Sequence, residues 1–334
     1  MIAVIAAHAS GAAYSGEYSS TGKWNFFFLL TYVQLLLFAV PALVFMSGYW
    51  SSKRPIESLQ DYRIFLIRKL SRILIPYLFW SFILLGYAAV RTQNIDVYKI
   101  ALKLLTGRAC YPYYFIIALV QLYIITPLLH YINRKQYGLI LVLVFSVMSL
   151  LAVYLSRVYN IIWHLPIYLP FYSWIMFYEI GLLMGTRRNK ATTAKNINFY
   201  VLPALIISML ISEIEAIMLV FKYNNLYFAI SPVKYSTFLY SICVIIAFVL
   251  VRERLKHWPR FLVTIGNYSF GIYLIHIPVL NQVAGFAQKS NVVFSFQPLY
   301  QFIVVALTLL TCLIIVGITR RLLPKPFCVK VLGF

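Results

Sequence analysis

Nine stretches of 17 or more residues contain no charged residue, and this pattern constrains the fold more than any other feature of the sequence. They cover residues 24–52, 73–90, 109–133, 136–156, 158–178, 196–212, 235–251, 261–288 and 290–319. A transmembrane helix needs about 20 mostly apolar residues, within a range of about 17–25. A spanning segment must also satisfy its backbone polar groups internally, as a helix does. The pattern predicts an all-α integral membrane protein with about ten transmembrane helices and a single domain over residues 1–334.

The composition supports a membrane protein and argues against nucleic acid as a partner. Of the 334 residues, 62% are hydrophobic and 11% are charged, whereas soluble domains carry about 25% charged residues. The net charge is +21, but the basic residues occupy short gaps between apolar stretches and form no separate basic domain or tail. The four cysteines, at positions 110, 243, 312 and 328, follow no metal-binding or redox spacing. We therefore expect the lipid bilayer as a partner, and no metal site.

Basic residues fall unevenly between the gaps, which sets an orientation. Twenty of the 29 Lys and Arg residues lie in segments 53–72, 134–135, 187–195, 252–260 and 320–330. Short loops rich in Lys and Arg stay in the cytoplasm. If these segments share that side, both termini are cytoplasmic and segment 91–108 is external. Segment 53–72 would then be a basic cytoplasmic loop between two membrane helices.

The amino-terminal segment, residues 1–13, is apolar but too short to cross a bilayer. Thirteen helical residues rise about 20 Å, against a hydrocarbon core of about 30 Å. A signal peptide is one interpretation, but this segment lacks the positively charged start of such a peptide. We expect instead a truncated first transmembrane helix whose cytoplasmic part lies upstream of Met1.

Residues 94–107 have a helical pattern of their own outside the apolar stretches. Val97, Ile100, Ala101 and Leu104 recur at helical spacing, and Gly107 is a typical helix end. The segment predicts a short helix, either an amphipathic helix on the outer membrane surface or a solvated loop helix.

Polar residues within apolar stretches are candidates for function, because they are costly in hydrocarbon. His8 could act as a general base, although a lone helix histidine is also a common structural hydrogen-bonding group. His276 lies two residues before Pro278, which could free a backbone carbonyl near the imidazole. Glu179, and Glu213 with Glu215, could pair with a buried Arg or His, although Glu213 and Glu215 could also simply mark a helix end.

Three basic residues, Arg68, Lys69 and Arg72, stand at the cytoplasmic entrance of the apolar stretch that begins at Ile73. Arg72 directly precedes this stretch and is expected to lie deepest. The group could only anchor the helix, or it could bind an anion, since guanidinium suits phosphate oxygens.

Six motifs together resemble the acyltransferase 3 family of integral membrane acyltransferases. They are Val4-Ile-Ala-Ala-His8, Val44-Phe-Met-Ser-Gly-Tyr-Trp50, Arg68-Lys-Leu-Ser-Arg-Ile-Leu-Ile-Pro-Tyr77, Tyr111-Pro-Tyr-Tyr-Phe-Ile-Ile-Ala-Leu-Val-Gln121, Tyr178-Glu-Ile-Gly-Leu-Leu-Met-Gly185 and Ser269-Phe-Gly-Ile-Tyr-Leu-Ile-His276. Their order and spacing match over nearly the whole chain. Within the family, the chain is most similar to the short branch that acts on poly-N-acetylglucosamine-type surface polysaccharide (the intercellular-adhesion type).

The resemblance implies transfer of an acetyl or succinyl group from cytoplasmic acyl-CoA to a sugar hydroxyl at the outer face. Acyl-CoA would be a substrate, with no permanently bound cofactor. His8 matches the histidine that deprotonates the hydroxyl. Arg72 matches the second arginine of an Arg-x-x-Arg pair, and Lys69 replaces the first, which keeps the charge but loses the fork of guanidinium. The family also places an arginine eleven residues before its histidine, where this chain has no residue.

The sequence thus predicts a bacterial plasma-membrane O-acyltransferase that modifies a cell-envelope polysaccharide or glycolipid. His8 would be the catalytic base, and Arg72, Lys69 and Arg68 would bind the acyl-CoA phosphates. The secondary polar groups would be His276, Glu179, Ser47 and Tyr49. Two alternatives remain open at this point: a polysaccharide exporter, and a non-catalytic partner of a membrane glycan synthase.

Overall fold

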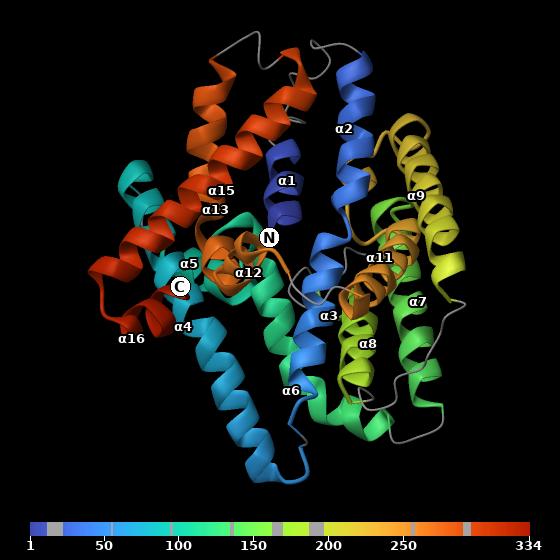
Figure 1. Ribbon diagram of the computed structural model, residues 1–334, viewed down its shortest axis with the longest axis horizontal. Coiled ribbons are helices and arrows are strands. Elements are labelled where there is room, and N and C mark those ends of the chain that lie inside the picture. The colour runs from blue at the N-terminus through green and yellow to red at the C-terminus, as the bar shows by residue number, and fades with distance from the viewer. Residues whose placement is uncertain are drawn as a thin grey trace. The chain divides into compact units, whose positions relative to one another are not determined.

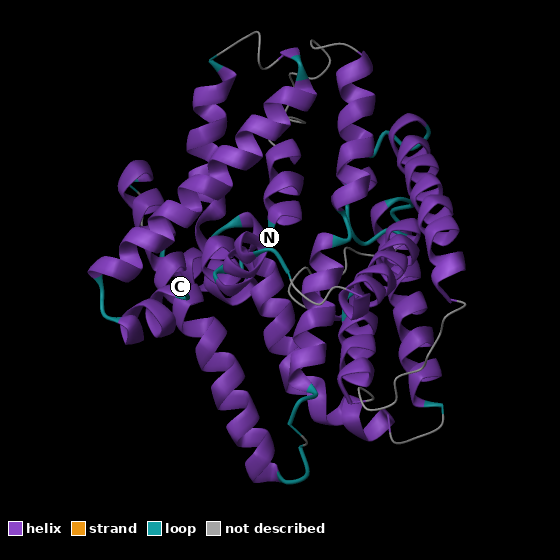
Figure 2. Ribbon diagram, viewed as in Figure 1, coloured by secondary structure: helices purple, strands orange, loops and turns teal. Residues whose placement is uncertain are grey.

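In the computed structural model, every described element is helical, as Figures 1 and 2 show. The structure describes residues 1–11, 23–54, 56–93, 96–133, 137–161, 170–186, 197–254, 258–289 and 295–334. Seven helical segments are long and apolar enough to cross a membrane: Trp24–Ser51, Leu59–Thr92, Tyr111–Asn133, Gly138–Arg157, Tyr200–Phe221, Ser269–Gln288 and Gln297–Leu322. Two shorter apolar helices, Ile175–Thr186 and Tyr235–Val251, bring these segments to nine. The predicted all-α membrane fold is confirmed.

The chain forms two compact units, and the first combines both ends of the sequence, residues 1–39 and 253–334. Its helices are α1 (Ile2–Gly11), α2 (Lys23–Leu36), α12 (Arg260–Asn267), α13 (Ser269–Gln288), α15 (Gln297–Leu322) and α16 (Lys325–Phe327), followed by a turn of π-helix, η4 (Cys328–Leu332). The short α1 packs against α2, α13 and α15 (Figure 1). Ala9 of α1 joins a buried apolar cluster with Leu280, Ala284, Tyr300 and Val304. The small Ala9 side chain lets the helices approach closely, as small residues do between membrane helices.

The second unit covers residues 40–252. Its elements are α3 (Ala39–Ser51, from Val40 on), α4 (Leu59–Thr92), α5 (Val97–Thr106), η2 (Tyr111–Tyr113), α6 (Tyr114–Asn133), α7 (Gly138–Arg157), η3 (Pro170–Ser173), α8 (Ile175–Thr186), α9 (Ile197–Phe221), α10 (Leu226–Ala229) and α11 (Tyr235–Arg254). Helix α6 is the centre of the unit, since α4, α5, α7 and α8 all pack against it.

Helix α4 corrects the expected basic loop over residues 53–72. The helix begins at Leu59, because Ser58 caps it: the Ser58 hydroxyl accepts from the Asp61 N–H, and the Asp61 carboxylate accepts from the Ser58 N–H. This reciprocal pair satisfies the first backbone donors of a helix. Four of the six basic residues of the segment are therefore helical, and α4 runs for 34 residues.

Three other predicted stretches are divided or displaced in the structure. The stretch over residues 24–52 breaks between α2 and α3, since Pro41 has no N–H to donate to the carbonyl of Leu37. The stretch over 261–288 divides at Tyr268 into α12 and α13. The stretch over 158–178 was expected to be one span, and residues 162–169 of it lie outside the described residues. In its described part, residues 158–161 follow the end of α7 at Arg157, η3 covers Pro170–Ser173, and α8 begins at Ile175.

The predicted short helix near residue 100 is confirmed as α5. The Asp96 side chain caps its start by accepting from the Lys99 N–H, and Gly107 ends it with a left-handed φ of 69°. A hydrogen bond from the Tyr77 hydroxyl to the Leu104 carbonyl ties α5 to α4.

Glycines bring α3 and α8 into backbone contact. A Cβ at Gly48 would meet the Tyr178 carbonyl oxygen, and one at Gly181 would meet the Phe45 carbonyl oxygen. Gly181 and Gly185 are four residues apart on α8, the small-residue spacing that lets membrane helices pack closely. This close packing positions the residues of α3 described below.

We expect Gly181→Leu to lower the free energy of unfolding by about 3 kcal/mol, the upper end of the usual cost of overpacking. The leucine side chain would collide with the backbone of α3, and this contact can be relieved only by moving a helix. The midpoint of thermal unfolding in detergent, followed by size-exclusion chromatography, would measure the loss. Gly317→Leu is the matched control, because nothing lies within 4 Å of a Cβ at Gly317. Equal midpoints for the two variants would contradict the proposed role of Gly181.

Candidate functional site

The structure brings together two of the predicted site residues, His8 of α1 and His276 of α13, in the first unit. Their ring centroids lie 5.3 Å apart, with the planes inclined at 42°. The side chain of His276 is fully buried, and His8 is half-buried. The two residues are 268 positions apart in sequence, so the packing of α1 against α13 creates the pair.

A backbone carbonyl fixes the tautomer of His276. Its Nδ1 lies 2.6 Å from the carbonyl oxygen of Tyr273, one turn earlier on α13. A carbonyl can only accept, so Nδ1 carries the hydrogen when the ring is neutral, and Nε2 keeps a lone pair. Nε2 is buried and makes no hydrogen bond with the described residues. A buried acceptor without a partner is unusual in a folded protein and calls for an explanation.

The basic residues of α4, in the second unit, differ in how far they are exposed. Arg68 and Arg72, one helical turn apart, are exposed, whereas Lys69 is half-buried. The Lys69 ammonium lies 5.2 Å from the ring centroid of Tyr123 and 5.8 Å from that of Phe65. Lys69 is therefore the most buried of the three side chains, whereas the expectation that Arg72 lies deepest at the membrane entrance stays a prediction. The two arginines instead present a cationic surface that an anion can reach.

Ser47 and Tyr49 of α3 lie in a network of hydroxyl groups and cations. The Ser47 hydroxyl hydrogen-bonds the Tyr123 hydroxyl at 2.8 Å, and the Thr126 hydroxyl bonds that of Tyr178 at the same distance. The Lys53 ammonium lies 4.2 Å from the centroid of the Tyr49 ring, and it donates to the Gly185 carbonyl at 3.0 Å. Ser47 is thereby linked through Tyr123 to Lys69, and Tyr49 is paired with Lys53.

Glu179 of α8 is fully buried and does not join this network. Asn133 of α6 is the polar side chain that approaches its carboxyl group. Neither carboxyl oxygen makes a hydrogen bond of ordinary geometry with the described residues. Glu213 and Glu215 were expected to pair with an Arg or a His. In the structure, both lie near the buried Lys234 instead.

Sequence reasoning missed Tyr123 and Tyr273, which contact the predicted residues, and Tyr178, which bonds Thr126. The chain has 27 tyrosines, so a tyrosine at these positions carries no signal of its own. Among the described residues, no three of His, Cys, Asp or Glu gather as a metal site would require. The structure thus offers a contact between the half-buried His8 and the buried His276, whose Nε2 lone pair is available. It also offers a cationic helix surface beside a hydroxyl network. The first can accept a proton, and the second can bind phosphate.

Comparison with known proteins identifies the family. The family model described as "Acyltransferase domain" matches residues 1–317. One curated relative, "Putative membrane-bound acyltransferase YfiQ" of Bacillus subtilis (strain 168), is 24% identical over 259 residues, covering 72% of this chain and 68% of that protein. No solved structure matches the chain. The family match includes the helices that carry His8, Arg72 and His276, so the chain belongs to the acyltransferase 3 family of membrane acyltransferases.

Proposed function

We propose that this membrane acyltransferase moves an acetyl or succinyl group from cytoplasmic acyl-CoA to a hydroxyl of a cell-envelope polysaccharide or glycolipid. The observation that carries the proposal is the contact between His8 and His276. The contact places two imidazoles together inside an apolar helix bundle, in a chain that belongs to an acyltransferase family. The Nε2 lone pair of His276 makes no hydrogen bond with the described residues.

In the proposed reaction, His8 takes the proton from the sugar hydroxyl as the oxygen attacks the thioester carbonyl carbon. The new C–O bond forms, the C–S bond breaks, and the proton on His8 passes to the CoA thiolate. The products are an O-acyl ester and free CoA. His276 would orient His8, in the way that a third group commonly orients a catalytic base.

The direct test is acyl transfer by the purified protein from radiolabelled acetyl-CoA to a defined oligosaccharide. Incorporation of label into the saccharide would support an enzyme. Transport of unmodified saccharide into proteoliposomes, without acetyl-CoA and without incorporation, would instead support the exporter. If neither occurs unless a glycan synthase is present, the protein is a partner of that synthase.

We expect the double variant Arg68→Ala/Arg72→Ala to bind acyl-CoA about 10-fold more weakly. A hydrogen bond to a charged group contributes about 1.5–3 kcal/mol, but an exposed ion pair contributes only about 0–1 kcal/mol. Because both guanidinium groups are exposed, we expect about 1.4 kcal/mol for the two together, which corresponds to about 10-fold. Isothermal titration with a non-hydrolysable acyl-CoA analogue would measure the affinity. Lys69→Arg, which retains the charge, should bind normally. An unchanged affinity in a well-folded double variant would leave these arginines as topological anchors.

We also propose that the protein lies in the bacterial plasma membrane with both termini in the cytoplasm, as the distribution of Lys and Arg indicates. Alkaline phosphatase folds only outside the cytoplasm. Fused after Arg108 it should therefore be active, and fused after Arg321 it should be inactive. The reverse result would overturn both the topology and the proposed direction of acyl transfer.

A further inference from the structure

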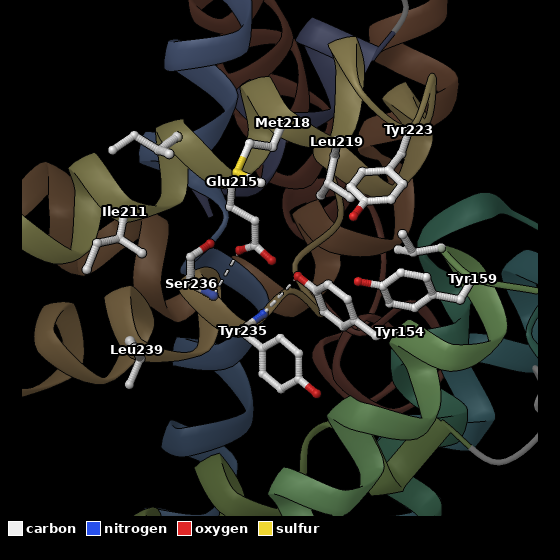
Figure 3. A pocket seen from close by; sticks show the side chains of 12 residues that line it. Tyr154, Tyr159, Ile211, Glu215, Met218, Leu219, Tyr223, Tyr235, Ser236 and Leu239 are labelled. Atoms are coloured by element: carbon white, nitrogen blue, oxygen red, sulfur yellow. Dashed lines mark hydrogen bonds between the residues drawn. The ribbon is translucent and has the colours of Figure 1, made fainter.

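A pocket of about 370 Å³ opens in the second unit between α7, α9 and α11 (Figure 3). This volume lies within the range of about 300–1,000 Å³ that small-molecule sites occupy. The pocket is formed where α7 and α9 end and α11 begins. Under the proposed topology, these ends lie at the outer face of the membrane, opposite the side on which acyl-CoA would bind.

Four tyrosines supply the aromatic part of the lining. Tyr154 stacks on Tyr235 with centroids 4.3 Å apart, and Tyr159 meets Tyr223 edge to face at 5.9 Å. The phenol groups of Tyr154, Tyr159 and Tyr223 are directed toward the same space as the Glu215 carboxylate (Figure 3). A sugar ring suits such a lining, because its C–H groups pack on the negative face of an aromatic ring while its hydroxyls reach polar partners.

Two polar groups in the pocket retain capacity for a ligand. Glu215 accepts the Ser236 N–H through Oε2 at 3.0 Å, which fixes the carboxylate and leaves Oε1 to accept another hydrogen bond. The Ser236 side chain is 2% exposed and lines the pocket, and its hydroxyl makes no hydrogen bond with the described residues. A hydroxyl of a ligand would satisfy these groups, and buried polar groups are normally satisfied.

The surrounding charges favour a neutral ligand. The buried Lys234 interacts electrostatically with both Glu215 and Glu213, so it offsets part of the negative charge of Glu215. A cationic ligand would also meet the Lys222 ammonium, which lies 5.4 Å from the centroid of the Tyr223 ring. No basic side chain lines the described pocket to bind an anionic group.

The rim of the pocket is apolar and faces outward. Ile211, Met218 and Leu239 line it and are among the large exposed apolar side chains of the structure. On membrane helices, such side chains face lipid chains. A ligand with its polar head in the pocket could therefore lay an attached hydrocarbon chain along α9 and α11.

From this arrangement, we propose that the pocket binds the sugar head of a neutral glycolipid, with its lipid chain in the bilayer. This rests on the proposed function in one respect: the bound glycolipid would be the form in which the acceptor hydroxyl reaches the enzyme. The pocket thus narrows the acceptor from any envelope glycan to a membrane-anchored one.

Binding can be tested without acyl transfer, with the whole protein in phospholipid nanodiscs. The probe is dodecyl β-D-glucoside, and the comparison ligand is tetraethylene glycol monododecyl ether, which has the same chain but no sugar. Native mass spectrometry would give both affinities. We expect the glucoside to bind at least about 10-fold more tightly than the ether.

Two variants identify the pocket as the site, each with a matched control. Glu215→Gln should weaken glucoside binding about 10-fold, and Ser236→Ala several-fold, as expected for losing a charged and a neutral hydrogen bond. Neither should change binding of the ether. Glu57→Gln, on an exposed residue before α4, controls for the loss of a carboxylate. Ser241→Ala controls for the loss of a buried serine hydroxyl on the same helix, because Ser241 does not line the pocket.

Equal binding of glucoside and ether, or unchanged glucoside affinity in folded Glu215→Gln and Ser236→Ala, would overturn the proposed site. Failure of the proposed function has a different signature. In that case the wild-type protein binds the glucoside as described, but transfers no acyl group to any glycolipid.

Discussion

Replacement of His8 by Ala is expected to lower acyl transfer by about 10²–10⁴-fold, the usual contribution of a general base. The expected loss is in kcat, because His8 acts on the acceptor hydroxyl in the transition state. Affinity for acyl-CoA should be unchanged, since the proposed phosphate-binding residues lie on α4. The measurement is the rate of label transfer from acetyl-CoA in detergent, at saturating acceptor.

His8→Gln separates a catalytic role from a structural one. Glutamine can hydrogen-bond much as a neutral imidazole does, but it cannot accept a proton near neutral pH. If His8 is the base, His8→Gln is as inactive as His8→Ala while unfolding at the wild-type temperature. Recovery of activity in His8→Gln would show that this position only supplies a hydrogen bond, and another base would have to be sought.

The fold class was predictable because a bilayer permits so few structures. Long apolar stretches without charge must become helices there, and the caps Asp96 and Gly107 mark α5 in the sequence itself. The start of α4 was not found, because its basic residues suggested a loop. Long basic side chains can leave a helix near the membrane surface and reach water along its side, so charge does not end a helix. The break at Tyr268 has no proline to announce it.

The sequence suggests candidate residues for the site, but it does not specify which of them are in contact. The motif resemblance pointed to His8, Arg72 and His276, but each lies in a different stretch of sequence. Whether two of them meet depends on which faces of α1 and α13 pack together. Small residues such as Ala9 allow a close approach, but the sequence does not show which neighbour Ala9 packs against. The orientation of Lys69 toward Tyr123 likewise depends on the rotation of α4 about its axis. No sequence pattern specifies which faces of α1 and α13 pack together or how α4 is rotated about its axis.

Replacement of His276 by Phe should lower kcat by about 10²-fold. This loss lies at the lower end of the range of about 10²–10⁴-fold expected for His8→Ala. The phenyl ring preserves the buried aromatic contact with His8, but removes the Nε2 lone pair and the bond from Nδ1 to the Tyr273 carbonyl. The Nε2 lone pair makes no hydrogen bond with the described residues, but it is the group on α13 that could accept one from the His8 ring when His8 takes the hydroxyl proton. Loss of a residue that orients a base can reduce kcat by up to about 10⁴-fold in a serine protease, and we expect less here because the two rings also pack against each other.

The double variant His8→Ala/His276→Phe decides whether the two histidines act as a unit. Residues that act through one another are strongly non-additive, so the double variant should be no slower than His8→Ala alone. An independent role for His276, such as binding the acceptor, would make the two losses multiply and would raise the KM for the acceptor in His276→Phe. Wild-type activity in His276→Phe would reduce the pair to a packing contact. Non-additivity together with an unchanged KM is the result that assigns His276 to positioning His8, because neither packing nor acceptor binding predicts both.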